Sequence, residues 1–155
     1  MKLVKTNSND QDFLKLVSLL DEGLKVTDGE DFGFYNQFNK LDLIKNVVVA
    51  YIDGKPSGCG AFKRFNEDTV EIKRMFVKPK NRSQGIAGSI LTELECWARA
   101  SGFTKCVLET GINQIEALGF YKKAGYQVIS NYGQYKGLKT SVCFEKVLIP
   151  QNKFE

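Results

Sequence analysis

The chain has 155 residues, of which 43% are hydrophobic and 26% are charged, a composition typical of a soluble globular domain. It contains no histidine, which excludes Ser-His-Asp and Cys-His catalytic arrangements and removes a common zinc ligand, so no metal is expected. Lys and Arg number 22 against 18 Asp and Glu, and this net charge of +4 suits a polyanionic small ligand better than nucleic acid.

Neither repeats nor Pro/Gly-rich linkers divide the chain, so a single domain over residues 1–155 is expected. No run of 18 or more apolar residues occurs, which predicts no membrane span. Charged residues follow Met1 too soon for a signal peptide, and a cytoplasmic location is therefore expected.

The four cysteines form no C-x-x-C pair and are expected to be reduced thiols. Three of them, Cys59, Cys106 and Cys143, lie in apolar, strand-like runs, whereas Cys96 does not. Buried packing is favoured over a catalytic role, because no histidine is present to activate a thiol.

The first elements in chain order are a short strand over residues 2–6 and a helix that follows the capping residues 8–10. Its apolar side chains Phe13, Leu14, Val17 and Leu20 recur at helical spacing. An irregular segment over residues 29–39 comes next and is rich in aromatic side chains, namely Phe32, Phe34, Tyr35 and Phe38.

Three β-prone runs follow, over residues 46–52, 58–65 and 69–77, and a turn over residues 53–56 joins the first two as a hairpin. The remaining chain alternates helices with strands. Helices are predicted over residues 85–101 and 114–124, and strands over residues 105–110, 126–130 and 140–148.

This order of elements predicts an α/β (α+β) protein. Its sheet is expected to be mixed and mostly antiparallel, to contain about seven strands and to be flanked by helices.

A loop rich in small and basic residues precedes the helix over residues 85–101. The first helical turn contains no Asp or Glu, so its N–H groups and positive dipole end are open to an anion. A diphosphate is one interpretation, and a tight turn whose small residues serve packing is the other. The small residues are Gly85, Ala87 and Gly88, and the basic ones are Lys78, Lys80 and Arg82.

The strand over residues 69–77 changes phase near its end, because Val70 and Ile72 alternate with charged residues whereas residues 75–77 are all apolar. A β-bulge near Lys73 and Arg74 would explain the change and could turn an N–H toward a ligand carbonyl. A strand end that is buried on both faces is the alternative.

Two motifs follow each other along the chain. The first is Arg82-x-x-Gly85-x-Ala87, after a strand ending in Met75-Phe76-Val77. The second comprises Leu108-Glu109-Thr110-Gly111 and Ala117-x-x-Phe120-Tyr121-x-x-x-Gly125-Tyr126. Together they resemble the GNAT superfamily of N-acetyltransferases: the first is similar to its acetyl-CoA signature R/Q-x-x-G-x-G/A, and the second resembles the second half of its core. The motifs cover residues 70–126, and the element order extends the resemblance over nearly the whole chain.

The resemblance implies a pair of splayed strands and acetyl-CoA as cosubstrate. Backbone groups of Met75 and Val77 would bind the pantetheine arm, and an N–H near Met75 or Phe76 would polarise the acetyl carbonyl. Asn113 often has a cofactor-binding counterpart, but with Glu116 it also fits a helix capping box, which is favoured. The pyrophosphate would lie beside Arg82 on the backbone of Ser83, Gln84, Gly85, Ile86, Ala87, Gly88 and Ser89.

Two residues are expected to catalyse direct attack of a primary amine on the thioester within a ternary complex. Glu71 is the candidate base, acting through water; a solvated glutamate paired with Lys73 is the alternative. Tyr121 matches the tyrosine that lies near the cofactor sulfur in this superfamily and would protonate the thiolate. Packing alone also explains its ring, which falls on an apolar helix stripe.

The expected acceptor is a small-molecule or peptide amine that binds under the aromatic segment, although those rings could equally belong to a local core. Neither nucleic acid nor a membrane is expected as a partner, and a homodimer is left open. Two other functions stay possible at this point: an acyl-CoA-binding module without turnover, and an interaction protein whose glycine-rich loop is only a turn.

Overall fold

The protein was analysed as a computed structural model that describes residues 1–28 and 44–149. The aromatic segment over residues 29–39 lies outside the described residues. The helices and 3-10 turns are α1 (Gln11–Asp28), η2 (Pro79–Asn81), α3 (Ile86–Ala100), α4 (Ile115–Lys123) and η3 (Gly133–Tyr135). The strands are β1 (Lys2–Thr6), β2 (Asn46–Ile52), β3 (Lys55–Arg64), β4 (Thr69–Val77), β5 (Lys105–Gly111), β6 (Gln127–Ile129) and β7 (Ser141–Val147).

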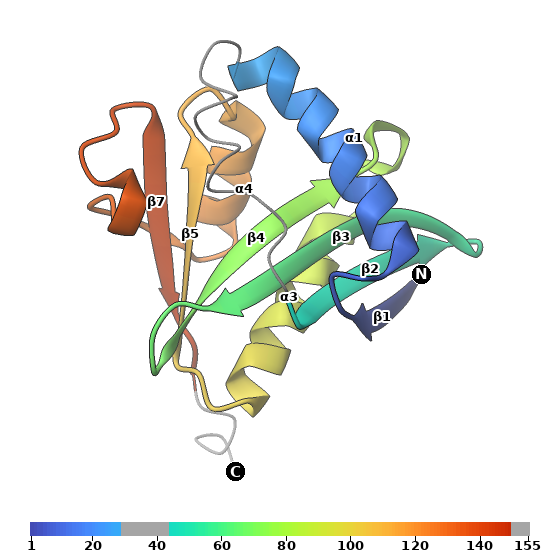
Figure 1. The fold of residues 1–155 in the computed structure, drawn as a ribbon, viewed down its shortest axis with the longest axis horizontal. Coiled ribbons are helices and arrows are strands. Elements are labelled where there is room, and N and C mark those ends of the chain that lie inside the picture. The colour runs from blue at the N-terminus through green and yellow to red at the C-terminus, as the bar shows by residue number, and fades with distance from the viewer. Residues whose placement is uncertain (29–43, 150–155) are drawn as a thin grey trace.

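The strands form one seven-stranded sheet in the order β1-β2-β3-β4-β5-β7-β6, with α1 on one face and α3 and α4 on the other (Figure 1). All neighbouring strands are antiparallel except β4 and β5. These two parallel strands pair only where Thr69–Glu71 meets Lys105–Val107, and both continue well beyond that point. The predicted fold class and the splayed strand pair are therefore confirmed.

Each face of the sheet has its own hydrophobic core. Phe13 and Val17 of α1 are buried against one face, and Ile86, Ile90 and Leu94 of α3 are buried against the other. Fully burying one such side chain contributes roughly 1.5–3 kcal/mol, so these two helices are fixed mainly by packing. None of the helices in the described ranges is both long and apolar enough to cross a membrane.

Two local predictions were wrong. The hairpin between β2 and β3 turns on two residues, Asp53 and Gly54, rather than four, because both adopt the positive φ that a tight hairpin needs. The predicted cap of α4 does not form either. Gln114 occupies the N-cap without a side-chain cap bond. Its backbone N–H closes a turn onto the Gly111 carbonyl, and Asn113 lies exposed in that turn.

The bulge predicted in β4 is present. Cys59 pairs with Phe76 while Ala61 pairs with Lys73, so Gly60 alone faces two residues of β4. One of these is Arg74, whose φ of 61° lies in the left-handed region. The strand end is also buried on both faces, because Phe76 belongs to the core beside α1 and Val77 to the core beside α3, so both interpretations of the change in phase are confirmed.

Gly60 has no room for a side chain opposite the bulge. An added Cβ would lie 2.4 Å from the Met75 sulfur and 2.9 Å from both Ile90 and Leu94. We expect Gly60→Ala to lower the free energy of unfolding by about 1–3 kcal/mol, because overpacking displaces core side chains. Urea unfolding would measure the loss.

Gly119→Ala provides the matched control for Gly60→Ala. Gly119 lies within α4, and a Cβ there would meet nothing within 4 Å among the described residues. This variant should be more stable by about 0.5–1 kcal/mol, because alanine favours the helix. Equal urea midpoints for Gly60→Ala and the unsubstituted protein would contradict the close packing at the bulge.

Candidate functional site

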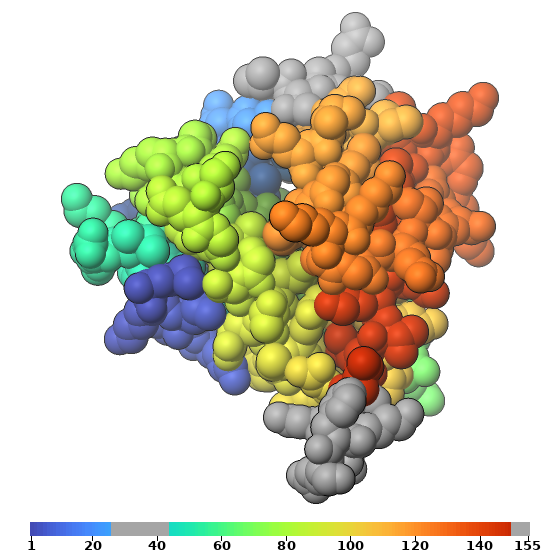
Figure 2. All heavy atoms as spheres, turned by 180° about the vertical axis from the view of Figure 1, so that it is seen from behind, coloured from blue at the N-terminus to red at the C-terminus, as the bar shows by residue number. Residues whose placement is uncertain are grey.

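A cavity of about 160 Å³ lies where β4 and β5 diverge, beyond the last pair of residues that joins them. Seen from the side of α3 and α4, the surface is hollowed between the loop that leads into α3 and the orange helix α4 (Figure 2). The cavity is lined from β4, β5, both flanking helices α1 and α4, and η3. The lining residues used below are Glu71, Lys73, Arg74, Glu109, Tyr121 and Tyr135.

The cavity is lined from both faces of the sheet. Val70 and Ile72 belong to the core under α3 and α4, so strand alternation places Glu71 and Lys73 on the α1 face. Tyr121 belongs to the core on the opposite face. Because all of Ile72, Glu71, Lys73 and Tyr121 line the same cavity, it connects the two faces through the gap between the strands.

Tyr121 is 7% exposed and packs edge-on against Tyr126, with ring centroids 5.7 Å apart. Its ring is therefore part of the hydrophobic core, as the packing interpretation predicted, and it also lines the cavity. Burial raises the pKa of the Tyr121 phenol above its usual value, so the hydroxyl keeps its proton at neutral pH. A protonated phenol at this position can act as a general acid.

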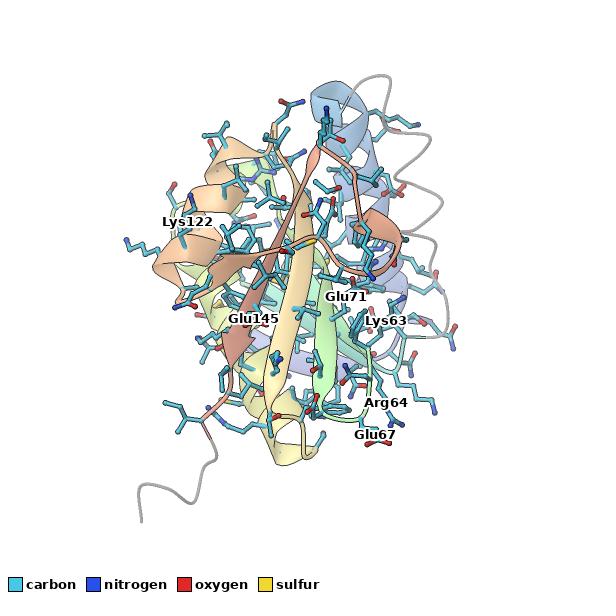
Figure 3. All side chains as sticks on the ribbon, turned by 90° about the vertical axis from the view of Figure 1, so that its left-hand side faces the viewer. Lys63, Arg64, Glu67, Glu71, Lys122 and Glu145 are labelled. Carbon is cyan, nitrogen blue, oxygen red and sulfur yellow. The ribbon has the colours of Figure 1, made fainter. Side chains whose placement is uncertain are left out.

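Glu71 lies at the fork between the strands and is only 3% exposed (Figure 3). One carboxylate oxygen accepts a 2.6 Å hydrogen bond from the Tyr132 hydroxyl. The other lies 3.7 Å from Lys73 Nζ and 4.0 Å from Lys63 Nζ. The predicted pairing with Lys73 is confirmed, but the interpretation of Glu71 as a solvated surface residue is wrong.

Tyr132 was missed by the sequence analysis. It lies just before η3, 61 residues from Glu71 along the chain, so no local spacing connects the two. Burial raises the pKa of Tyr132, and the neighbouring Glu71 raises it further. The only local signal was a pair of tyrosines, Tyr132 and Tyr135, in a loop that is mostly polar.

Lys73 is a nearly buried cation, with 8% of its side chain exposed. Burial lowers the pKa of Lys73, and Glu71 opposes that shift. The charged wall of the cavity is therefore a set of coupled, poorly solvated groups, which is the environment in which functional sites are commonly found.

The loop before α3 leaves its backbone amides open. Gly85 is the N-cap with φ at 80° and gives no side-chain cap, and the first helical bond runs from the Ser89 N–H to the Gly85 carbonyl at 3.1 Å. The amides of Ile86, Ala87 and Gly88 thus have no carbonyl acceptor within the helix. The first turn contains no acidic residue.

The two glycines of this loop are not required for packing. A Cβ added at Gly85 or Gly88 would meet nothing within 4 Å among the described residues. Both glycines, with Ser89 and Phe120, line an open groove that runs between α3 and α4. Packing therefore explains neither glycine, although Ala87 packs against the core and the positive φ of Gly85 favours glycine in the turn. The space beside the glycines is of the kind that a phosphate group would fill.

Arg82 holds the strand end beside this loop. Its Nε donates to the Val77 carbonyl at 2.9 Å, and its guanidinium lies 5.7 Å from the Phe76 ring. The Lys78 N–H bonds to the Ser57 carbonyl, so in the antiparallel pattern the preceding residue, Val77, directs its backbone groups away from β3. The Val77 N–H therefore faces the side on which β4 has no partner.

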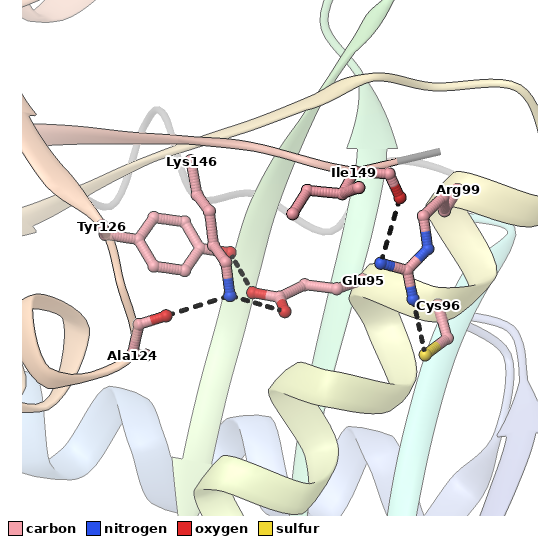
Figure 4. Close-up of polar contacts among 7 residues, drawn as sticks. All are labelled: Glu95, Cys96, Arg99, Ala124, Tyr126, Lys146 and Ile149. Carbon is pink, nitrogen blue, oxygen red and sulfur yellow. Dashed lines mark hydrogen bonds and ion pairs between the residues drawn. The ribbon is translucent and has the colours of Figure 1, made fainter. Parts of the chain in front are cut away.

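A buried polar network fixes α4 relative to α3 and β7 (Figure 4). Glu95 accepts hydrogen bonds from the Tyr126 hydroxyl at 2.8 Å and from Lys146 Nζ at 3.0 Å. Lys146 also donates to the carbonyl of Ala124, immediately after α4, at 2.9 Å. Removing one partner of such a buried network lowers the stability of the protein more than removing one partner of a surface pair. The network therefore keeps α4, the helix that contains Tyr121, in place.

Three of the four cysteines, Cys59, Cys106 and Cys143, have the buried packing role that was favoured. Burial raises the pKa of Cys59 and Cys106 to about 12 and that of Cys143 to about 11, so these thiols are protonated at neutral pH. Cys96 is exposed on α3. No three metal-ligating side chains gather within residues 1–28 and 44–149.

The first turn of α3 contains no acidic residue and lies beside a gap in a mixed sheet, and this gap contains a carboxylate and a protonated phenol. The fold and the site together define an acyltransferase of the kind that uses a coenzyme A thioester. The Acetyltransferase (GNAT) family matches residues 14–126, which is most of the chain. The chain therefore belongs to the GNAT family of acetyltransferases.

Three relatives illustrate the similarity. An IAA acetyltransferase of Azospirillum brasilense is 36% identical over 102 residues, which are 65% of this chain and 67% of that protein. A crystal structure described as an acyl-CoA N-acyltransferase of Klebsiella pneumoniae superposes with a TM-score of 0.79 at 26% identity, over 96% of this chain and 97% of the other. The PaiA N-acetyltransferase of Thermoplasma acidophilum, solved with coenzyme A, shares the fold with a TM-score of 0.70 at 20% identity, over 95% and 99% of the two chains.

Proposed function

We propose that the protein transfers the acetyl group of acetyl-CoA to a primary amine by direct attack within a ternary complex. The observation that carries this proposal is the cavity through the sheet, which brings Glu71 and Tyr121 together from opposite faces. The open amides at the start of α3 would bind the pyrophosphate, and Asn113, exposed beside the cavity-lining Gln114, would contact the cofactor.

The backbone at the bulge would orient the thioester. Met75 and Val77 would hydrogen-bond the pantetheine arm, and the N–H of Met75 or Phe76 would polarise the acetyl carbonyl. The Val77 N–H supports this role because it points away from β3, and the bulge supports it because the ladder is interrupted at Met75.

Glu71 and Tyr121 would move the two protons of the reaction. An alkylamine is neutral in well under about 1% of molecules at pH 7, so Glu71 accepts a proton from it through water. Acetyl-CoA supplies the acetyl group, whose carbonyl carbon bonds to the amine nitrogen as the C–S bond breaks. Tyr121 then donates its proton to the departing thiolate, and its phenolate regains a proton, through water, from the nitrogen that has just been acylated. The products are an N-acetylamine and free coenzyme A.

An amine panel tests the proposal most directly. The protein is incubated with acetyl-CoA and single amines, products are read by mass spectrometry, and the release of free thiol and the thermal shift with coenzyme A are recorded in parallel. Acetylated amine with equal thiol release is the expected result. A thermal shift without any turnover would favour a non-catalytic acyl-CoA-binding module, and no thermal shift would overturn the loop assignment as well.

Glu71→Gln is expected to lower kcat by about 10- to 100-fold, because the amide keeps the shape but cannot accept the proton. Affinity for acetyl-CoA should change little, since the cofactor contacts lie elsewhere. Steady-state rates and calorimetric titration would measure the two effects.

Glu145→Gln is the matched control for this substitution. Glu145 lies on β7, forms a half-exposed ion pair with Lys105 at 3.7 Å and does not line the cavity. A pair of this kind contributes at most about 1 kcal/mol, and kcat should stay at the unsubstituted value. Equal kcat values for Glu71→Gln and Glu145→Gln would remove Glu71 from the mechanism.

A further inference from the structure

The cavity wall on the α1 face contains two acidic and two basic residues, and its two carboxylates already have protein partners. Glu71 is engaged by Tyr132 and Lys73, and Glu109 accepts a 2.7 Å hydrogen bond from the Ser141 hydroxyl. Neither carboxylate of this wall is therefore an isolated charge.

Arg74 has donors that are not used. Only 4% of its side chain is exposed, and within residues 1–28 and 44–149 the guanidinium pairs with Asp21 of α1, at 3.3 Å from Nη1. The buried Nε finds no acceptor among the described residues. A buried donor without a partner costs about 1–3 kcal/mol, so a ligand atom that accepts from it would recover that loss.

The chemistry of a guanidinium restricts what this ligand group can be. Arginine has five N–H donors in a planar fork and no acceptor, and the fork matches a carboxylate in geometry and charge. Burial lowers the pKa of Arg74, but Asp21 opposes the shift and the group stays charged at neutral pH. Lys73, beside it in β4, adds a second positive charge to the same wall.

We infer that the acceptor of this enzyme is an amine that also has a carboxylate, and that Arg74 binds this carboxylate. The inference rests on the proposed acetyl transfer and names its acceptor class. The acceptor's positively charged amine would lie toward Glu71, and its carboxylate would lie toward Arg74. A zwitterion therefore complements the negative and positive charges of this cavity wall. Leu20 and Leu24 of α1 form an apolar border for the rest of the molecule.

Lysine and cadaverine are a suitable pair of probes, because they share a terminal aminoalkyl group and only lysine has a carboxylate. γ-Aminobutyrate and butylamine are a second pair. We expect kcat/KM to be at least about tenfold higher for the member with the carboxylate, and the difference to appear mainly in KM. Dipeptides with a free C-terminus, tested beside free amino acids, distinguish the two sources of such a group.

Arg74→Asn should reduce the preference within each pair to about twofold or less, while KM for acetyl-CoA stays unchanged. Asparagine is chosen because it tolerates the left-handed backbone at this position. Arg64→Asn removes the same charge from the end of β3, outside the cavity lining, and should keep the full preference.

A binding measurement on the unsubstituted protein keeps the inference testable if Arg74→Asn does not fold. With coenzyme A bound, calorimetry should detect lysine at least about tenfold more tightly than cadaverine. Acetylation of amines without preference for the carboxylate, or a preference that survives in Arg74→Asn, would overturn the inference and leave acetyl transfer standing. No thiol release with any amine would overturn both.

Discussion

Tyr121→Phe is expected to lower kcat at least about tenfold, while affinity for acetyl-CoA stays within about twofold of the unsubstituted protein. Phenylalanine keeps the ring that packs against Tyr126 and Phe144, so the core and the cavity wall are preserved. Only the proton donor is lost. Single-turnover rates with saturating amine would measure the chemical step, and calorimetry would measure the affinity.

Tyr51→Phe is the control for the loss of a hydroxyl elsewhere. The Tyr51 hydroxyl donates to Asp12 at 2.7 Å and lies on β2, outside the cavity lining. Its removal should cost about 1 kcal/mol of stability and leave kcat unchanged. If Tyr121→Phe also kept full kcat, the Tyr121 ring would serve packing only, and another group would have to protonate the thiolate.

Gly88→Glu should weaken acetyl-CoA binding by about 100-fold or more, which corresponds to about 2.7 kcal/mol. Gly88 lies in the first turn of α3 and lines the groove, so the new carboxylate would compete with the phosphates for the open amides. The protein itself should become more stable, because a helix start favours an acidic residue and replacing glycine favours the helix. Lower affinity would then appear together with a higher Tm.

Gly88→Gln separates charge from size. Glutamine has nearly the same volume as glutamate, and an added Cβ at this position meets nothing within 4 Å among the described residues. We expect its loss of affinity to be about tenfold smaller than that of Gly88→Glu. Acetyl-CoA binding at the unsubstituted level in a folded Gly88→Glu protein would show that the phosphates lie elsewhere.

The sequence predicted most of the fold because its strands alternate regularly and its helices have clear apolar faces. The bulge could also be proposed from the sequence, since an extra residue in one strand produces a slip in alternation such as that between Ile72 and Met75. The loop before α3 could be recognised for a similar reason: the absence of acidic residues from a first helical turn is a local property.

The parts of the site that could not be predicted depend on contacts across the fold. Tyr132 meets Glu71, and Asp21 meets Arg74, over separations of 61 and 53 residues, which no local pattern reveals. The cap prediction at Asn113 was wrong because a turn closed by backbone groups delayed the start of α4 by one residue. A capping residue specifies a helix start only where the preceding backbone places its side chain within reach of the free N–H groups of the first turn.

The short pairing between β4 and β5 divides the sheet into two half-sheets that share three residue pairs at one end. An extended ligand arm between them would connect the two half-sheets, since its hydrogen bonds to Val77 would take the place of β5 beside the end of β4. The thioester would then stiffen the very opening that receives it. Departure of free coenzyme A would return that freedom to the two half-sheets, and the same fork would admit the next donor molecule.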